Sequence, residues 1–331
     1  MKRTIYIFSG GELKRKQNTL YFEREKGGRK YIPVENTGEI MIFGEVTINK
    51  RLLDFLSQHE IILHFFNYYG YYSGSFYPRD HYNSGYMVLK QCEHYLDEGK
   101  RIELARRFVE GSLANIRKVL SYYANRGVEV YDIIHKIEEL EQQTGIKEST
   151  EALMAIEGNA RDLYYKTFNK IINNDDFEFK RRSRRPPHNR INALISFGNS
   201  LVYVVTLSEI YKTHLDPRIG FLHTSNFRRF TLNLDVAEIF KPILVDRVIF
   251  YLINKGIINK KHFINSLGGV SLNEKGRMLF IEEFDKRLKT VIQHSSVKKR
   301  VSYRRLIRLE LYKLEKHLIG EKNYKPFVAH W

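Results

Sequence analysis

The chain has 331 residues, 43% of them hydrophobic and 28% charged, which is typical of a folded protein and not of a disordered one. Its single cysteine, Cys92, excludes an internal disulfide and a cysteine-based zinc cage, and it favours a reducing, cytoplasmic setting. The 55 Lys and Arg against 38 Asp and Glu give a net charge of +17, which favours a polyanionic partner such as nucleic acid.

Residues 1–80 have the pattern of a small β-sheet domain, of the kind that forms a sandwich. Short runs rich in β-branched and aromatic residues are separated by turn signals such as Ser9-Gly10-Gly11. One amphipathic helix interrupts them at 49–58, where apolar residues recur at helical spacing. The predicted strands are 4–8, 18–24, 31–34, 38–44, 61–66 and 71–77.

From about residue 83 the apolar pattern becomes helical, with side chains recurring at steps of three and four. The sequence therefore predicts an α+β protein, with a small N-terminal β domain at 1–80 and a larger all-α domain at 81–331. The boundary is expected at 78–85, around Pro78. The predicted helices are 97–123, 130–143, 148–173, 189–213, 234–255, 273–294 and 301–319.

Two connectors interrupt the helical part. The first, 180–187, reads Lys-Arg-Arg-Ser-Arg-Arg-Pro-Pro, and its proline pair predicts a loop. The second, 216–223, joins two helices and ends at a histidine. No run of about 18 uncharged apolar residues occurs, and the start of the chain lacks the apolar core of a signal peptide. We therefore expect no membrane-spanning segment.

Three places carry side chains suited to chemistry. Glu157 precedes Gly158, and a glycine inside a helix costs about 1 kcal/mol relative to alanine, which suggests the close approach of a backbone or a ligand. His223 follows an apolar Phe-Leu pair and begins a polar turn. Asp235 and Glu238 are three residues apart, so both lie on one helical face.

Each place also has an ordinary structural interpretation: an i,i+4 ion pair, a histidine that packs a turn, and two acids that complement a helix dipole. Together, two acids and a histidine suit a divalent cation such as Mg²⁺ or Mn²⁺, which would neutralise phosphate charge. Spacing alone does not show that the three segments meet. A metal-dependent nuclease is thus one interpretation, and a non-catalytic, basic nucleic-acid-binding scaffold is the alternative.

Three stretches of this chain carry a resemblance to a known family: YYGYYSGSFYP at 68–78, AIEGNARDLYY at 155–165 and GFLHTSNFRRFTLNLDVAEIFKPILVDRVIF at 220–250. They resemble the first, universal CRISPR-associated protein family, the integrase of spacer acquisition. The resemblance extends over essentially the whole chain. It implies an N-terminal β domain, an α-helical catalytic domain, and metal-dependent DNA endonuclease and integrase activity.

The resemblance also implies roles for particular residues. Glu157, His223 and Glu238 match the family's metal-binding and catalytic positions, with Asp235 as the alternative third carboxylate and Mg²⁺ or Mn²⁺ as the cofactor. Arg161, Tyr164 and Tyr165 match positions expected to contact DNA.

The basic clusters at 180–185 and 298–308 predict further phosphate contacts, and Arg304 and Arg308 share one helical face. The residues expected to bind DNA in these clusters are Lys180, Arg181, Arg182, Arg184, Arg185, Arg304 and Arg308.

The implied reaction is attack by the 3′-hydroxyl of a short double-stranded DNA on a phosphodiester of the CRISPR repeat. Water in place of that hydroxyl would give nuclease activity. The implied partners are a second copy of the chain, bound through the β domain, and the second CRISPR-associated protein. An RNA-directed nuclease is a further interpretation, because phosphate contacts carry little information about the kind of nucleic acid.

Overall fold

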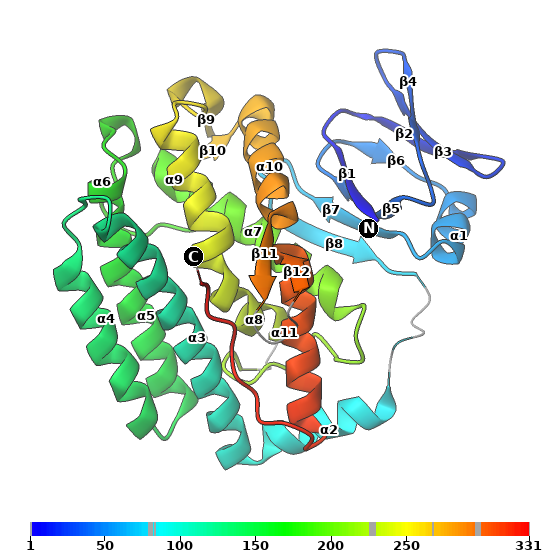
Figure 1. Cartoon of the computed structure of the whole chain (residues 1–331). Coiled ribbons are helices and arrows are strands. Elements are labelled where there is room, and N and C mark those ends of the chain that lie inside the picture. The colour runs from blue at the N-terminus through cyan, green and yellow to red at the C-terminus, as the bar shows by residue number, and fades with distance from the viewer. Residues whose placement is uncertain are drawn as a thin grey trace. The chain divides into compact units, whose positions relative to one another are not determined.

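The computed structural model describes residues 2–78, 82, 84–224, 230–266, 268–294 and 299–330. The chain divides into two compact units, Met1–His81 and Tyr82–Trp331 (Figure 1). The expected boundary around 78–85 includes residues 79–81 and 83, which lie outside the described residues. Strands dominate the first unit and helices the second, so the predicted α+β class is confirmed.

The first unit consists of two four-stranded sheets and one helix. One sheet has the order β1-β5-β7-β8, in which β1, β5 and β7 are parallel and β8 is antiparallel to β7. The other has the order β4-β3-β2-β6, in which β2, β3 and β4 are antiparallel and β6 runs parallel to β2. The elements are β1 (Arg3–Ile7), β2 (Gly11–Lys16), β3 (Thr19–Arg24), β4 (Arg29–Ile32), β5 (Thr37–Ile42), β6 (Val46–Thr47), α1 (Lys50–Gln58), β7 (Ile62–Phe66) and β8 (Tyr72–Phe76).

Both sheets and the helix contribute to one core. Every residue of β5 is buried, as expected of a central parallel strand covered on both faces. Helix α1 begins after Asn49, whose side chain accepts a hydrogen bond from the Leu52 amide at 3.0 Å. Leu52 and Phe55 of this helix pack with Leu13 and Leu20 of the second sheet. The sequence pattern does not predict β2, because Leu13 is the one apolar residue in GELKRK.

The second unit is mostly helical. Its helices are α2 (Gly85–Leu96), α3 (Glu98–Ala124), α4 (Tyr131–Gln143), α5 (Thr150–Lys166), α6 (Phe168–Ile171), α7 (Arg190–Ile210), α8 (Leu232–Lys241), α9 (Arg247–Asn254), α10 (Glu274–Lys289) and α11 (Tyr303–Leu318). Short 3₁₀ turns lie at Thr144–Ile146, Asp175–Phe177 and Lys260–His262. Two antiparallel hairpins pair β9 (Phe263–Ser266) with β10 (Gly269–Leu272), and β11 (Val291–His294) with β12 (Lys299–Ser302).

Two predicted helices need correction, and with them the description of this unit as all-α. The stretch 234–255 is divided by a π-helical turn at Pro242–Asp246, because Pro242 cannot donate a backbone hydrogen bond. The stretch 273–294 ends as a helix at Lys289, and the β-branched residues beyond it form β11. The segment 180–187 contains no helix or strand, as predicted.

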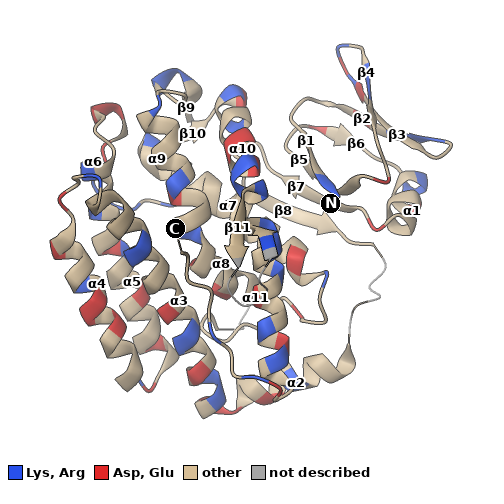
Figure 2. Ribbon diagram, viewed as in Figure 1, with Lys and Arg blue, Asp and Glu red and all other residues tan. Residues whose placement is uncertain are grey.

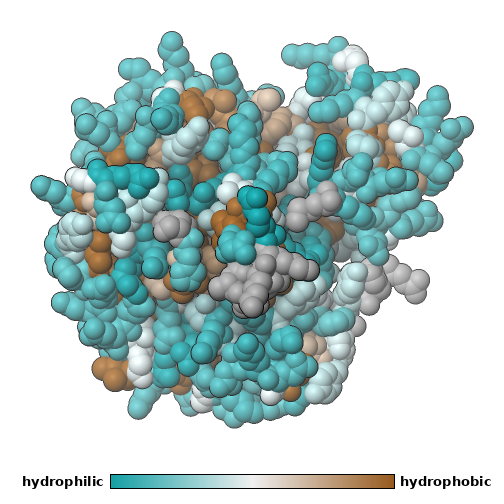
Figure 3. Space-filling view, in the orientation of Figure 1, coloured by the Kyte–Doolittle hydropathy of each residue, from teal (hydrophilic) through white to brown (hydrophobic). Residues whose placement is uncertain are grey.

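Helix α7 lies at the centre of the helical unit. It is long and apolar enough to cross a membrane by length and composition, but 83% of the relevant window is buried inside the unit. A helix that is apolar all round is typical of a protein core. On the face seen in Figure 3, hydrophobic residues lie in small patches between hydrophilic ones.

Gly198 allows α7 to approach its neighbours closely. A Cβ atom at this position would lie 2.8 Å from Cζ of Phe280 and would also meet Val245. Gly158 of α5 is different, because no heavy atom of the described residues outside its own helical turn and chain neighbours lies within 4 Å of the position where its Cβ would be. The two helical glycines therefore differ in the space that surrounds them.

We predict that Gly198→Ala lowers the free energy of unfolding by about 1–3 kcal/mol, because the added methyl group overpacks the core. Gly158→Ala is the matched control and should raise it by up to about 1 kcal/mol, because alanine favours the helix. Urea denaturation of both variants measures the difference. Equal stabilisation by the two substitutions would contradict the close packing at Gly198.

Candidate functional site

Glu157 and Arg161 are placed side by side by helix α5. The helix begins after Ser149, whose hydroxyl accepts a hydrogen bond from the Ala152 amide at 3.2 Å. Residues four apart lie on one helical face, and Nε of Arg161 donates to Oε1 of Glu157 at 3.3 Å. The predicted i,i+4 pair is therefore present.

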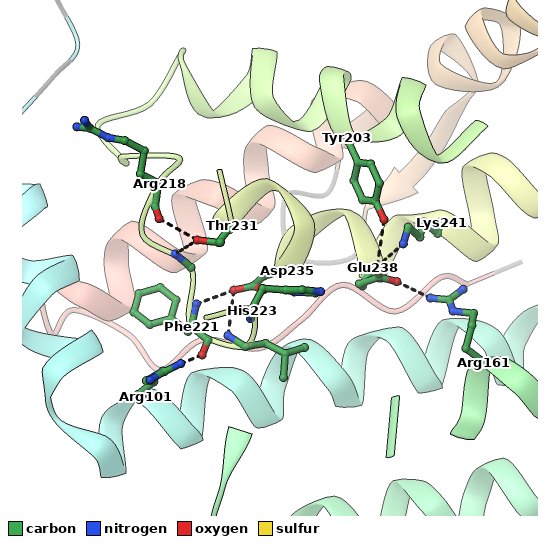
Figure 4. Close-up of polar contacts among 12 residues, drawn as sticks. Arg101, Arg161, Tyr203, Arg218, Phe221, His223, Thr231, Asp235, Glu238 and Lys241 are labelled. Carbon is green, nitrogen blue, oxygen red and sulfur yellow. Dashed lines mark hydrogen bonds and ion pairs between the residues drawn. The ribbon is translucent and has the colours of Figure 1, made fainter. Parts of the chain in front are cut away.

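Arg161 also connects α5 with two other helices. Its Nη2 donates to Oε2 of Glu238 on α8 at 2.7 Å (Figure 4). The same Nη2 donates to Oγ of Ser112 on α3 at 3.3 Å. The guanidinium is buried, so these contacts occur with little competition from water. Arg161 thus holds the carboxylates of Glu157 and Glu238 at one place.

Asp235 organises the loop that carries His223. Its Oδ2 accepts hydrogen bonds from the amides of Phe221 at 2.6 Å and Leu222 at 3.1 Å. Its Oδ1 accepts from the His223 amide at 3.0 Å and from Nδ1 of the same residue at 2.7 Å. Because Asp235 is fully buried and accepts four hydrogen bonds, it acts as the anchor of this loop.

This arrangement fixes which nitrogen of His223 is available. A carboxylate can only accept, so Nδ1 carries the proton that Asp235 binds. In the neutral ring, the lone pair then lies on Nε2. Figure 4 shows the ring between the carboxylates of Asp235 and Glu238. Asp235 therefore holds Nδ1 of His223, and Nε2 is the ring nitrogen whose lone pair could bind a metal ion.

Other contacts hold the same loop from outside. The side chain of Gln91 on α2 accepts from the Asp216 amide at 2.7 Å and donates to the Ile219 carbonyl at 3.2 Å. Nε of Arg101 on α3 donates to the Phe221 carbonyl at 3.1 Å (Figure 4). The loop before His223 is consequently fixed from three helices, α2, α3 and α8.

Glu238 has cationic neighbours on two sides. Its Oε1 forms an ion pair with Lys241, one turn later on α8, and its Oε2 accepts from Arg161. The hydroxyl of Tyr203 lies 3.5 Å from Oε1, and Nζ of Lys241 lies 4.7 Å from the centre of the Tyr203 ring. Burial alone would raise the pKa of Glu238, but Lys241 and Arg161 outweigh burial and lower that pKa to about 2.

Glu157 has the opposite electrostatic environment. Burial and the negative charge of Glu238 raise the pKa of Glu157 above its usual value. Burial would lower the pKa of His223, but the hydrogen bond and charge of Asp235 outweigh burial and raise it. Two carboxylates that influence each other in this way favour an added positive charge between them.

The carboxylates and the imidazole are of the kinds that bind a divalent cation. In this structure, however, they pair with neighbouring side chains and lie too far apart to share one ion, an arrangement that we call the closed site. Among the described residues, no three His, Cys, Asp or Glu side chains lie close enough to hold a metal ion. Arg161 and Lys241 instead neutralise Glu238. The structure brings Glu157 and Glu238 to one shared arginine, and it joins His223 to Asp235 on the same helix as Glu238.

Three residues of this site were not predicted. Lys241 lies three residues after Glu238, a spacing that could have indicated the ion pair. Tyr203 comes from α7, and nothing in its local sequence connects it with α8. Asp246 lies on the π-helical turn, where burial raises its pKa to about 6 and its Oδ2 is 3.9 Å from Nη1 of Arg161. Sequence spacing gives no sign of either long-range contact.

The residues expected to bind DNA fall into three structural classes. Arg161, Tyr164 and Tyr165 are buried, each less than a tenth exposed, so they are not part of an open DNA-binding surface in this structure. The loop residues Lys180, Arg181, Arg184 and Arg185 are exposed. Arg182 turns inward and donates to Oδ1 of Asn192 at 2.9 Å and to Oγ of Ser196 at 3.0 Å.

Arg304 and Arg308 form the third class, because both bind a buried acid. Nε of Arg304 donates to Oε1 of Glu209 at 2.9 Å, and Nε of Arg308 donates to Oε2 at 2.6 Å. Lys212 completes the cluster at 3.0 Å. Lys298, in the same basic segment, lies outside the described residues. The two arginines lie on one face of α11, as predicted, and their contacts with Glu209 connect α11 with α7.

Comparison with known proteins identifies the family. A family model described as CRISPR associated protein Cas1 matches residues 5–286. A CRISPR-associated endonuclease Cas1 2 of Thermodesulfovibrio yellowstonii is 63% identical over 331 residues, which is 100% of both chains. The chain belongs to the Cas1 family.

Solved structures extend this Cas1 relationship to the fold. A Cas1 protein from Thermotoga maritima superposes with a TM-score of 0.89 at 47% identity, covering 98% of this chain and 99% of that one. A casposase bound to an integration product gives a TM-score of 0.89 at 21% identity, covering 99% of this chain and 94% of that one. At that identity the second likeness shows a shared fold.

Glu209 gives a test of the α7–α11 connection in this Cas1-family chain. Burial would raise its pKa, but Lys212, Arg304 and Arg308 outweigh burial and lower it to about 2. A depressed pKa stabilises the fold above the ordinary value of 4.5, and this stabilisation is lost as the pH falls toward 2.

We predict that Glu209→Gln lowers the free energy of unfolding at pH 7 by about 3 kcal/mol, because two arginines lose their buried partner. Between pH 4.5 and pH 2 the variant should lose less stability than the wild type, because the titrating carboxylate is gone. Denaturant titrations at several pH values measure both effects. Exposed Glu321, paired with Lys316, supplies the control Glu321→Gln, and equal effects of the two substitutions would contradict the prediction.

Proposed function

We propose that this Cas1-family chain is a metal-dependent DNA endonuclease and integrase that joins short DNA fragments to a CRISPR repeat. The observation that carries the proposal is the arrangement of Glu157, Glu238 and His223, with the last oriented by a buried aspartate. Relatives named CRISPR-associated endonuclease Cas1 are 63% and 49% identical to it, the second being from Thermotoga maritima and aligned over 96% of this chain. Both support a nuclease of the CRISPR system.

The donor set supports Mg²⁺ or Mn²⁺ as the cofactor. Carboxylate oxygens with one imidazole nitrogen are ligands that these ions accept. Glu157, Glu238 and Nε2 of His223 would hold the ion, while Asp235 would hold His223. Such an ion polarises a scissile phosphate and stabilises the negative charge that develops on the leaving oxygen. Glu238 is preferred over Asp235 as third ligand, because Asp235 already accepts four hydrogen bonds.

The two buried cations of the site have a second role in this proposal. Arg161 and Lys241 neutralise Glu238 when no other cation does. A divalent ion held by Glu238 would reduce the need for these two cations, and both groups could then donate hydrogen bonds to phosphate oxygens. The same side chains would thus stabilise the closed site and then position the DNA backbone.

The reaction exchanges one phosphodiester for another. A P–O bond forms to the incoming 3′-oxygen while the P–O bond to the leaving 3′-oxygen breaks. With water as the nucleophile, the same site hydrolyses DNA. The site residues are suited to either reaction, because they bind the phosphate and not a particular nucleophile.

The proposed contact surface for DNA is the exposed part of the basic loop. Lys180, Arg181, Arg184 and Arg185 are exposed on a segment without helix or strand. Figure 2 shows Lys and Arg prominent along α11, whereas α4 carries mainly acidic residues. Contacts of this kind bind phosphates and weaken steeply with salt.

We also propose that the chain acts with Cas2 and with a second copy of itself. A solved Cas6-RT-Cas1–Cas2 complex contains a chain that matches this fold with a TM-score of 0.84 at 19% identity, over 36% of that chain. The match itself supports the Cas1 fold, and the presence of Cas2 in that assembly supports Cas2 as the partner proposed for this chain. A homodimer formed through the β unit remains a prediction from the family resemblance.

The first prediction concerns the proposed ligands. Glu157→Gln, His223→Ala and Glu238→Gln should each lower metal-dependent DNA cleavage and strand transfer at least about 100-fold, because each removes a group that positions transition-state charge. DNA binding and its salt dependence should change little. The assay uses purified protein with Cas2, labelled duplex DNA, and a plasmid carrying a CRISPR repeat, with Mn²⁺, Mg²⁺ or EDTA.

Asp162→Asn is the matched control, because Asp162 is an exposed acid of the same helix, paired with Lys166. It should retain wild-type activity. Full activity of Glu157→Gln would refute the proposed site. Salt-sensitive DNA binding without any metal-dependent reaction of the wild type would favour the scaffold function, and preferential cleavage of RNA would favour an RNA-directed nuclease.

The second prediction concerns Lys241 and does not depend on catalysis. Lys241→Met removes a cation that competes for Glu238, so the affinity for Mn²⁺ should rise about tenfold, which corresponds to about 1.4 kcal/mol. Electron paramagnetic resonance titration of Mn²⁺ without DNA measures this affinity.

Lys212→Met is the control, because Lys212 also pairs with a buried glutamate three residues away, outside the proposed site. Its Mn²⁺ affinity should equal that of the wild type. An unchanged or lower affinity in Lys241→Met would show that Lys241 does not compete with the ion.

A further inference from the structure

Residues 323–330, which we call the strap, form neither helix nor strand yet pack into the helical unit. Tyr324, Phe327 and Ala329 are buried, while Lys325 and His330 are exposed. Figure 1 shows the strap, in red, running between α3 and α11 and across α8. An irregular segment stays in such a place only if its buried backbone groups find partners.

Two buried polar side chains provide those partners. Oδ1 of Asn115, on α3, accepts from the Ala329 amide at 2.8 Å, and its Nδ2 donates to the Phe327 carbonyl at 2.8 Å. Oε1 of Glu310, on α11, accepts from the Tyr324 hydroxyl at 2.6 Å and from the Phe327 amide at 3.0 Å. The strap is therefore held by specific hydrogen bonds at its three buried residues, Tyr324, Phe327 and Ala329.

Apolar packing matches the polar contacts. The ring of Phe327 stacks on that of Phe240 of α8, with centroids 5.7 Å apart and planes inclined by 8°. Pro326 occupies the space beside Gly111 of α3, where a Cβ atom would lie only 2.6 Å from Cβ of Pro326. The helical unit thus has a shaped seat for the strap.

The seat of the strap is directly connected to the candidate site. Nδ2 of Asn115 also donates to the carbonyl of Ile239, at 3.0 Å, and Ile239 is the residue after Glu238. Pro242 has no N–H, so the usual helical hydrogen bond to the Glu238 carbonyl cannot form. Asn115 therefore binds α8 at the place where the backbone hydrogen bonding of α8 is interrupted by Pro242. Phe327 packs on Phe240, which is two residues after Glu238.

We propose that the strap is a positioning element for the carboxylates of α8, with Asn115 and Phe327 as its positioning residues. The docked strap holds the segment Glu238–Phe240 in place, so that Glu238 and Asp235 present their side chains correctly. The effect on catalysis rests on the proposed function, whereas the effect on α8 itself does not.

The test compares Phe327→Leu with Phe43→Leu in the full-length chain. Phe43 is also a buried, stacked ring, 4.3 Å from Phe66, but it lies in the β unit. Hydrogen exchange of amides 236–241 should be at least tenfold faster in Phe327→Leu and unchanged in Phe43→Leu. The kcat for metal-dependent DNA cleavage should fall about tenfold in Phe327→Leu, with KM for DNA within twofold of the wild type.

A conservative variant and a second substitution keep the test decisive. Phe327→Tyr retains the stacked ring and should restore exchange and kcat, which a nonspecific loss of stability would not explain. Asn115→Asp removes the two hydrogen bonds that Nδ2 donates, to the carbonyls of Ile239 and Phe327, and should reproduce the Phe327→Leu phenotype. Slow exchange and full kcat in Phe327→Leu would overturn the proposal. A wild type without metal-dependent cleavage would refute the proposed function instead, and the exchange experiment would still test the strap.

Discussion

Arg161 is the buried cation that allows carboxylates from two helices to share one site. Without it, Glu157 and Glu238 would lie in a poorly solvated region with Lys241 as the one compensating cation that contacts Glu238, and an uncompensated charge is costly in a protein interior. Its three hydrogen-bond partners come from α3, α5 and α8, so one guanidinium group connects these helices. Lys241 adds the remaining charge from α8 itself. In this structure the site is therefore held together by ion pairs, and in the proposed function a divalent cation would take the place of some of them.

Asp235 and Glu238 show how two acids on one helical face acquire different roles. Asp235 accepts hydrogen bonds from three backbone amides and one imidazole N–H. Its carboxylate therefore stabilises the conformation of the loop 220–223. Glu238 is bound by the side chains of Arg161 and Lys241. Backbone donors are fixed by the fold, whereas lysine and arginine side chains have several rotamers. The helix thus provides one carboxylate that is bound mainly by backbone amides and one that is bound by side-chain cations.

Local patterns in the sequence predicted most elements, and long-range contacts explain what was missed. The all-buried strand β5 and the amphipathic helix α1 have clear signatures, whereas β2 depends on Leu13 alone. The three segments with Glu157, His223 and Glu238 were identified by residue type and by family resemblance, and their meeting point was not predictable from spacing. Glu209 illustrates the limit, because an acid in an apolar helix gives no sign that Arg304 and Arg308 will bind it 95 and 99 residues later.

Packing explains two of the glycines in the helices, Gly111 and Gly198, but it does not explain Gly158. At Gly111 and Gly198 a neighbouring side chain, Pro326 or Val245, fills the space that a Cβ would need. At Gly158 no such atom lies within 4 Å, although a glycine there weakens α5. The expected close approach of another protein backbone is therefore absent among the described residues, and the other expectation, a ligand beside Glu157, stays a prediction. In the proposed function, a DNA backbone that approached Glu157 would use the space beside Gly158, which no described side chain fills.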